Sequence, residues 1–209
     1  MTDIPDPTPK LAILLLAAGA ASRMRGGDKL LEEVDGVPLL QRLSSHACAV
    51  CDTVLVCLRE GQSAREFVLS GLKLQVIVVA DAAEGMAHTM RAGIAHLSKD
   101  ITGVMVVPAD MPELTERDLQ EMVQAHHAHP HAILRATSQS NQPGHPVTFP
   151  ARLFDELQTL SGDVGARSVL KRHIAEIIDI PLPYQHALID LDTPEDWSAW
   201  RLSQRESGS

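Results

Sequence analysis

A short segment near the N-terminus combines glycines with positively charged side chains. Residues 16–29, LAAGAASRMRGGDK, hold three glycines, two arginines and a lysine directly after the apolar run LAILL. Small residues let backbone N–H groups approach phosphate oxygens, and Arg and Lys neutralise phosphate charge. Neither the Walker A pattern nor GxGxxG is present, because Lys29 is not followed by Ser or Thr and Gly19 is followed by two alanines. The segment indicates a phosphate-binding loop of another kind, with a plain strand-to-helix turn as the alternative.

Acidic side chains in two later segments could accompany a bound phosphate. Asp110 follows the apolar run GVMVV within VPADMP, and the segment IDLDTPED holds Asp190 and Asp192 two residues apart. Two such residues in a strand would lie on the same side of it. Magnesium prefers oxygen ligands and is commonly bound by one or two carboxylates together with substrate phosphates. Asp110 is a candidate ligand, with a turn aspartate between prolines as the alternative.

The bulk composition limits the classes of partner. The formal net charge of −9 argues against a nucleic-acid binder, whose affinity would depend on many Lys and Arg contacts to phosphates. No apolar run approaches the roughly 18 residues of a membrane helix, and MTDIPDPTPK is neither a signal nor a transit peptide. We therefore expect a cytoplasmic protein with neither nucleic-acid nor membrane partners. The histidines of residues 126–131 are interpreted as a solvated helix end, with a metal site as the alternative.

Apolar runs alternate with amphipathic stretches along the first 130 residues. The expected strands are Leu11–Leu16, Thr53–Leu58, Leu74–Val79 and Gly103–Val107, and the expected helices are Pro38–Val50, Gln62–Ser70, Gly85–Leu97 and Thr115–Ala128. Beyond them we expect strands at Ile133–Thr137, Pro146–Phe149 and Ile177–Ile180, and helices at Ala151–Leu160, Val164–His173 and Pro194–Leu202. This order predicts an α/β fold with a mainly parallel sheet, helices on both faces, and ligands at the carboxyl ends of the strands. A single domain is expected over residues 10–203, between disordered tails at 1–9 and 204–209.

Several motifs resemble those of one enzyme family. LAAGAASRM followed by Lys29 resembles the signature L-x-x-G-x-S-x-R-M-G-x-x-K of the MobA-like nucleotidyltransferases, which include the molybdenum cofactor guanylyl- and cytidylyltransferases. The resemblance continues, in the family's order, through KLLEEVDGVPLL, EGMAHTMRAGI, VPADMP, GHPVTFP, GDVGARSVL and IDLDTPEDW. The AAG at Ala17–Gly19 is similar to the cytidylyltransferase subgroup, because guanylyltransferases tend to carry AGG there.

The resemblance implies a fold and a reaction. The fold would be a three-layer, Rossmann-like α/β/α nucleotidyltransferase fold with a mainly parallel mixed sheet. The reaction would be Mg²⁺-dependent transfer of CMP from CTP to the phosphate of molybdopterin, with release of pyrophosphate. GTP or UTP as donor, a sugar or alditol phosphate as acceptor, and a nucleotide-binding regulator without turnover are the alternatives. A molybdoenzyme that receives the product would be a maturation partner.

The resemblance also implies roles for individual residues. The implied catalytic residues are Arg23, Lys29 and Asp110. The implied nucleotide contacts are Leu16, Ala17, Ala18, Gly19, Ser22, Arg23, Lys29, Gly85, Met86 and His88. The implied acceptor contacts are His145, Pro146, Asp163 and Arg167. The implied metal ligands are Asp110 and Asp192, with Asp190 as the alternative to Asp192 and a helix-entry role as the alternative interpretation of Asp192. His88 and His145 stand where the family usually has serine and asparagine.

Overall fold

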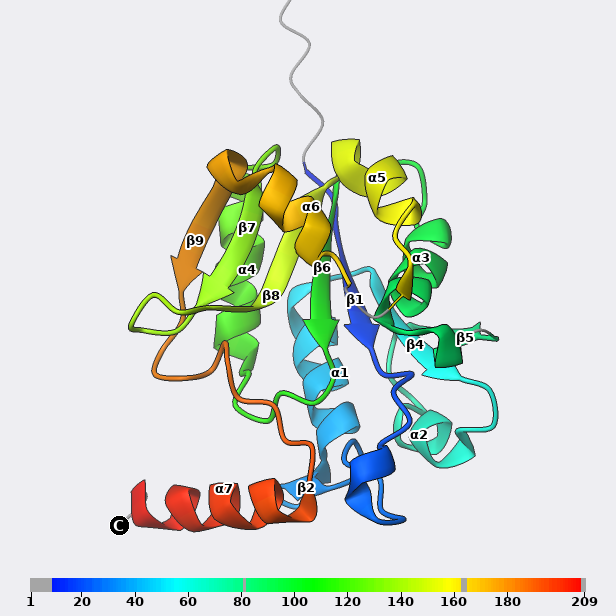
Figure 1. Ribbon diagram of the computed structural model, residues 1–209, viewed down its shortest axis with the longest axis vertical. Coiled ribbons are helices and arrows are strands. Elements are labelled where there is room, and N and C mark those ends of the chain that lie inside the picture. The colour runs from blue at the N-terminus through cyan, green and yellow to red at the C-terminus, as the bar shows by residue number, and fades with distance from the viewer. Residues whose placement is uncertain (1–8, 81, 163–164, 208–209) are drawn as a thin grey trace, which may run out of the picture.

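Seven strands form one mixed β-sheet at the centre of the computed structural model, which describes residues 9–80, 82–162 and 165–207 (Figure 1). The strand order is β5-β4-β1-β6-β8-β7-β9. Strand β8 is antiparallel to both neighbours, whereas the other pairs are parallel. The strands are β1 (Leu11–Leu16), β4 (Val54–Arg59), β5 (Gln75–Val79), β6 (Gly103–Pro108), β7 (Ile133–Thr137), β8 (Pro143–Pro150) and β9 (Ile177–Pro181). The predicted mainly parallel mixed sheet is confirmed.

Helices cover both faces of this sheet, which gives the three layers that the sequence predicts. One face packs against α1 (Leu39–Val50) and α4 (Glu116–Ala128), with α2 (Ser63–Val68) in contact with α1. Helix α7 (Pro194–Ser207) lies beyond the carboxyl ends of the strands, and its Trp197 joins the same buried cluster (Figure 1). The other face packs against α3 (Met86–Ala95), α5 (Phe154–Gln158) and α6 (Arg167–Arg172) (Figure 1). Leu, Val, Ile, Ala and Met side chains alternate between two buried clusters along the central strands, as expected of strands that are covered on both sides.

Several elements differ from the sequence prediction. The helix expected at Ala151–Leu160 is split into a 3₁₀ turn, η3 (Ala151–Leu153), and α5, and a two-stranded ribbon of β2 (Glu33–Val34) and β3 (Val37–Pro38) was not predicted. Helix α7 continues to Ser207 instead of ending at Leu202, so residues 204–207 are helical rather than part of a disordered tail. Within the described ranges, every helix is too short or too polar to cross a membrane.

Three segments that are distant in sequence meet at one edge of the sheet. Leu16 and Pro108 are opposite each other where β1 and β6 end, and the Ala109 N–H donates to the Leu16 carbonyl at 3.2 Å. Because β8 runs in the opposite direction, its first residues, Pro143–His145, lie at this same edge. The glycine-containing loop, Asp110 and the start of β8 are therefore neighbours, as the rule for ligand sites in such sheets requires.

Candidate active site

The loop after β1 is built around a short 3₁₀ helix, η1 (Ser22–Met24). Ala21 and Arg25, on either side of it, adopt left-handed conformations with φ of 49° and 50°, and the buried side chain of Met24 attaches the turn to the core. Gly19 is exposed and Ser22 follows it in the same loop, and a Cβ built on Gly19 would meet no described atom within 4 Å. The loop thus presents an open backbone surface at the edge of the sheet.

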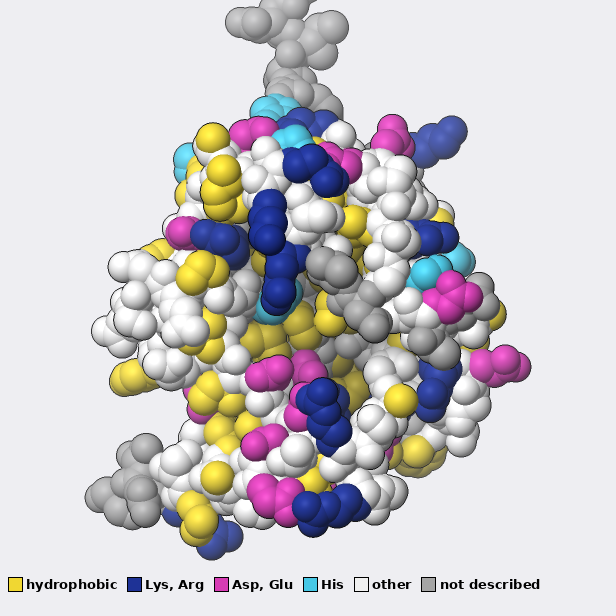
Figure 2. All heavy atoms as spheres, viewed as in Figure 1, with side chains coloured by type: hydrophobic (Ala, Val, Ile, Leu, Met, Phe, Trp, Pro, Cys, Tyr) yellow, Lys and Arg dark blue, Asp and Glu magenta, His cyan; other side chains and the backbone are white. Residues whose placement is uncertain are grey.

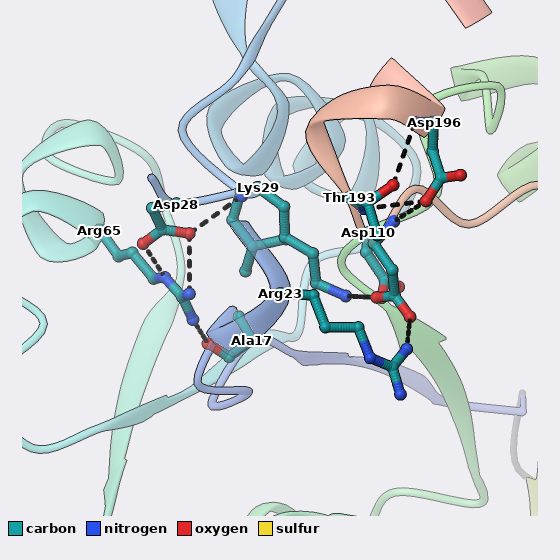
Figure 3. Close-up of polar contacts among 10 residues, drawn as sticks. Ala17, Arg23, Asp28, Lys29, Arg65, Asp110, Thr193 and Asp196 are labelled. Carbon is teal, nitrogen blue, oxygen red and sulfur yellow. Dashed lines mark hydrogen bonds and ion pairs between the residues drawn. The ribbon is translucent and has the colours of Figure 1, made fainter. Parts of the chain in front are cut away.

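Lys29 connects the carboxylates of Asp110 and Asp192. Its Nζ lies 2.5 Å from Asp110 Oδ2 and 2.5 Å from Asp192 Oδ1, and Arg23 Nη1 donates to the other oxygen of Asp192 (Figure 3). Burial lowers the pKa of Lys29, but the charges and hydrogen bonds of the two carboxylates outweigh burial and raise its pKa above the usual value. The hydrogen bond from Lys29, opposed by burial and supported by the charges of Lys29 and Arg23, holds the pKa of Asp192 below its usual value. Arg23, Lys29 and Asp110 therefore share one charged cluster.

Asp192 is available to this cluster because its neighbour caps the helix. Thr193 Oγ1 accepts the Asp196 N–H at 3.1 Å, and Asp196 Oδ2 accepts the N–H groups of Thr193 and Asp192 at 2.9 and 3.2 Å (Figure 3). This reciprocal pattern is a capping box at the start of α7. The helix-entry role considered for Asp192 is thus performed by Thr193 and Asp196.

Asp190 lies in an irregular segment, not in the strand that the spacing suggested. Burial raises the pKa of Asp190, and the negative charges of Asp110 and Asp192 raise it further. Three neighbouring carboxylates are a donor set that suits a hard divalent cation. Among the described residues, however, no three acidic, His or Cys side chains are arranged to hold a metal alone. The donor set fits a metal whose remaining ligands are phosphate oxygens and water.

Three of the four histidines in residues 126–131, His127, His129 and His131, are exposed as predicted for a solvated helix end, but His126 is not. The side chain of His126 is fully buried, and neither ring nitrogen has a hydrogen-bond partner among the described residues. A Cβ built on Gly103 would lie 2.4 Å from His126 Cε1, so the ring packs directly on β6. This position against the sheet makes His126 a core residue.

The expected base-binding segment is at the start of α3. Gly85, with φ of 107°, precedes the helix, and the side chain of Met86 is partly exposed. His88 is directed back along the chain, because its Nε2 lies 2.8 Å from Glu84 Oε2 and its Nδ1 lies 3.2 Å from the Glu84 carbonyl. The His88 imidazole is therefore already paired with Glu84, whereas the side chain of Met86 is exposed.

A cavity of about 890 Å³, called here the β8–α6 cavity, adjoins the charged cluster. Its lining includes Asp110, Asp190, His145, Arg167 and Lys171. Burial lowers the pKa of His145, although the charges of Asp110 and Asp190 act in the opposite direction. Its Nδ1 is buried without a partner among the described residues.

Pro146, which was also expected at the acceptor, is not part of the cavity lining. It follows His145 in β8 and is buried in the strand. Asp163 lies outside the described residues. Of the residues expected at the acceptor, His145 and Arg167 are therefore the two that the structure places at the cavity.

Arg65, which holds the loop after β1 through hydrogen bonds to Ala17 and Asp28, was not identified from the sequence. Only 2% of its side chain is exposed. Its Nε and Nη2 donate to Asp28 Oδ2 and Oδ1 at 2.7 and 2.8 Å, and its Nη1 donates to the Ala17 carbonyl (Figure 3). No pattern in the six-residue helix α2 distinguishes Arg65 from a surface arginine. Lys171, also missed, could have been found from its spacing of four residues from Arg167, which places both on one helix face.

Comparisons with known proteins show which family the chain belongs to. A family model described as the MobA-like NTP transferase domain matches residues 13–177. The molybdenum cofactor guanylyltransferase of Rhodopseudomonas palustris (strain BisB5) is 31% identical over 211 residues, which cover 95% of this chain and 97% of the relative. The bifunctional protein GlmU of Leifsonia xyli subsp. xyli (strain CTCB07) is 33% identical over 122 residues, so the match covers 56% of this chain but only 25% of GlmU.

A solved structure has the same fold. The crystal structure of Rv0371c from Mycobacterium tuberculosis H37Rv matches with a TM-score of 0.79 at 23% identity, over 92% of this chain and 98% of that chain. Rv0371c was also solved in complex with manganese, and that structure matches with a TM-score of 0.73 at 22% identity over 91% and 97% of the two chains. The family model covers most of the chain, and the full-length relative agrees with it. The protein therefore belongs to the MobA-like NTP transferase family and is a nucleotidyltransferase.

Proposed function

We propose that this nucleotidyltransferase transfers CMP from CTP to the phosphate of a molybdopterin-type acceptor and releases pyrophosphate. In this reaction an acceptor phosphate oxygen attacks the α-phosphorus, the bond to the bridging oxygen of the leaving pyrophosphate breaks, and negative charge develops on that group. Positioning and cations supply most of the catalysis in such a transfer. The observation that carries the proposal is the position of Lys29 Nζ, 2.5 Å from both Asp110 and Asp192.

The positive side chains would bind the triphosphate. Arg23 is largely exposed and can rotate from Asp192 towards a phosphate, where its planar guanidinium can bind two oxygens at once. The Lys29 side chain is only 14% exposed, and its raised pKa keeps it charged at the working pH. The open backbone of Gly19 and the hydroxyl of Ser22 lie in the same loop and would supply further donors.

A divalent cation would be held by Asp110 together with Asp192 or Asp190. When bound, it would offset the negative charge of the triphosphate. Lys29 would then lie beside these carboxylates and fix their orientation through the two hydrogen bonds that it already makes. The manganese complex of Rv0371c and the oxygen-rich donor set favour a hard cation, with Mg²⁺ as our proposal.

The choice of CTP rests on the loop sequence. Ala17 and Ala18 are buried where β1 ends, and Ala18 stands where guanylyltransferases tend to have glycine. The AAG sequence at this position is similar to that of the cytidylyltransferase subgroup, which supports CTP as the donor. Since the relative from Rhodopseudomonas palustris is named a guanylyltransferase, GTP is the competing donor.

The test compares donors directly. The protein is incubated with molybdopterin and each of CTP, GTP, UTP and ATP, with Mg²⁺ or Mn²⁺ or after removal of metal by EDTA, and pyrophosphate release is measured. We expect release with CTP that depends on both metal and acceptor. Selective release with GTP would overturn the donor assignment, and release that does not require molybdopterin would overturn the acceptor assignment.

A further inference from the structure

Two of the three basic side chains on helix α6 face the β8–α6 cavity without a partner among the described residues. Arg172 is bound to Glu156, with its Nη2 2.5 Å from Glu156 Oε1. Arg167 and Lys171 lie on another face of the helix and line the cavity. Neither makes a hydrogen bond or ion pair with any residue that the structure describes. Val169, which lies between Arg167 and Lys171 in the sequence, is fully buried in the core. It anchors α6, so Arg167 and Lys171 are held at the cavity.

The other charged side chains that line the cavity leave these two cations uncompensated. Arg135 also lines it, but its Nε and Nη2 donate to Asp179 at 2.8 and 3.1 Å, so this guanidinium is already neutralised. In Figure 2, Lys and Arg side chains gather over α6 on one side of a hollow, Asp and Glu side chains gather on the other side, and hydrophobic side chains lie between them. The lining between the two charged sides includes Met90, Val147 and Phe149.

We infer that Arg167 and Lys171 bind a second anionic group of the acceptor, away from the phosphate that receives the nucleotide. The inference rests on the proposed function, because it assigns the β8–α6 cavity to the acceptor. Unpaired cations next to an apolar surface attract an anion more strongly than cations surrounded by water, because the low local polarity screens them less. In a protein of net charge −9, two such cations at one wall are a local exception that favours an anionic ligand.

Two separated charge contacts would also fix the orientation of the acceptor. A molecule with one negative group would be held at one end only, at the α6 end, because Lys29 is already paired with Asp110 and Asp192. A molecule with a negative group at each end and an apolar or aromatic body would fit in the productive direction, with its phosphate beside Asp110 and Lys29. The acceptor class is therefore an aromatic phosphate ester with a second anionic group on its body.

Binding of two fluorescent probes tests this assignment without nucleotide transfer. Pterin-6-carboxylate carries an aromatic body and one negative group, and pterin lacks the carboxylate. We expect the full-length protein to bind pterin-6-carboxylate more tightly than pterin, with a preference that weakens at high salt. Lys171→Met and Arg167→Met should each weaken pterin-6-carboxylate binding about tenfold, the effect of losing one charge-assisted hydrogen bond, and leave pterin binding unchanged. Lys171→Arg should retain binding.

Arg172→Met is the matched control, because Arg172 is on the same helix but is engaged by Glu156. Its binding of pterin-6-carboxylate should equal that of the wild type. Equal binding of the two probes, or an effect of Arg172→Met as large as that of Lys171→Met, would overturn the inference. If probe binding follows Arg167 and Lys171 but molybdopterin receives no nucleotide, the proposed function fails and the anion site stands. If transfer occurs, Lys171→Met should raise the KM for molybdopterin and leave the KM for the nucleotide unchanged.

Discussion

Asp28 and Arg65 form a two-pronged ion pair beside the loop that follows β1. The carboxylate of Asp28 receives both Arg65 hydrogen bonds and also accepts the Leu30 N–H at 3.0 Å. Through Nη1, Arg65 reaches the Ala17 carbonyl at the start of the loop. One buried guanidinium thus connects the two ends of residues 17–30, and Lys29 is the residue next to Asp28. We interpret Arg65 as a positioning residue for Lys29.

Arg65→Met should destabilise the protein and also impair the loop. Breaking a buried ion pair leaves an uncompensated carboxylate, which costs about 3 kcal/mol of unfolding free energy. In addition, kcat should fall and the KM for the nucleotide should rise, because the loop ends lose their connection. Arg65→Lys, which keeps the charge but not the two-pronged geometry, should recover part of both effects. Urea unfolding and steady-state kinetics measure the two effects separately.

The double variant Asp28→Asn with Arg65→Met is the control for this prediction. The amide that replaces the Asp28 carboxylate can still accept the Leu30 N–H and carries no unpaired charge, so the double variant should be more stable than Arg65→Met alone. Folded Arg65→Met protein with wild-type kcat and KM would show that Arg65 is structural only.

Asp110→Asn should abolish most turnover with little change in stability. The amide keeps the shape of the side chain but removes the charge that a cation and Lys29 require. Lys29 still has Asp192 as a partner at 2.5 Å, so the cluster should stay folded. By analogy with the loss of one electrostatic contact in other active sites, kcat should fall about 10²- to 10³-fold. Pyrophosphate release and thermal unfolding are the measurements, and unchanged turnover would remove Asp110 from the site.

The sequence predicts the site best where the prediction depends only on the order of the strands and helices. The βαβ alternation determines which strand ends share an edge, so it was enough to predict that the loop after β1 and Asp110 lie together, whereas the place of the C-terminal aspartates was implied only by the family resemblance. The pairing of Lys29 with Asp192 was not predicted, because it depends on which residue caps α7. Thr193 and Asp196 form the cap, and that leaves the Asp192 side chain for Lys29.

Arg65 and His126 show why other parts could not be predicted. Arginine is a mostly exposed residue type and histidine an intermediate one, and each of these two side chains is buried against a residue distant in sequence: Asp28 for Arg65, and Gly103 for His126. The helix periodicity of α4 is compatible with either a solvated or a buried histidine near its end. Only the close approach of β6 decides between them.

Gly144→Ala should disturb the C-terminal side of the site. A Cβ built on Gly144 would lie 2.0 Å from the Ala187 carbonyl oxygen, a backbone atom that cannot move alone. The neighbouring His145 N–H donates to that same oxygen at 2.8 Å, so the methyl group would separate β8 from the segment that leads to Asp190. We expect reduced stability, measured by urea unfolding, and a raised KM for the acceptor in steady-state kinetics.

Gly162→Ala is a control for the Gly144 prediction, because it introduces backbone strain without a steric clash with another described segment. Gly162 has a positive φ of 70°, but a Cβ there would meet no described atom within 4 Å. It should lower stability through backbone strain without raising the KM for the acceptor. Equal KM values for the acceptor in Gly144→Ala and the wild type would contradict the prediction that the contact between Gly144 and Ala187 supports acceptor binding.

His126→Leu should remove an acid-dependent loss of stability. Burial, reinforced by the charges of His127 and His131, lowers the pKa of His126 from 6.5 to about 4. The unfolded chain therefore binds a proton between about pH 6.5 and 4 that the folded protein does not, and the stability present above pH 6.5 is lost as the pH falls through this window. A shift of this size corresponds to about 3 kcal/mol between pH 7.5 and pH 4. Leucine has a similar size and does not titrate, so urea unfolding of His126→Leu should show a pH dependence that is weaker by about this amount. If the two proteins lose stability in parallel as the pH falls, His126 is not held neutral in the core.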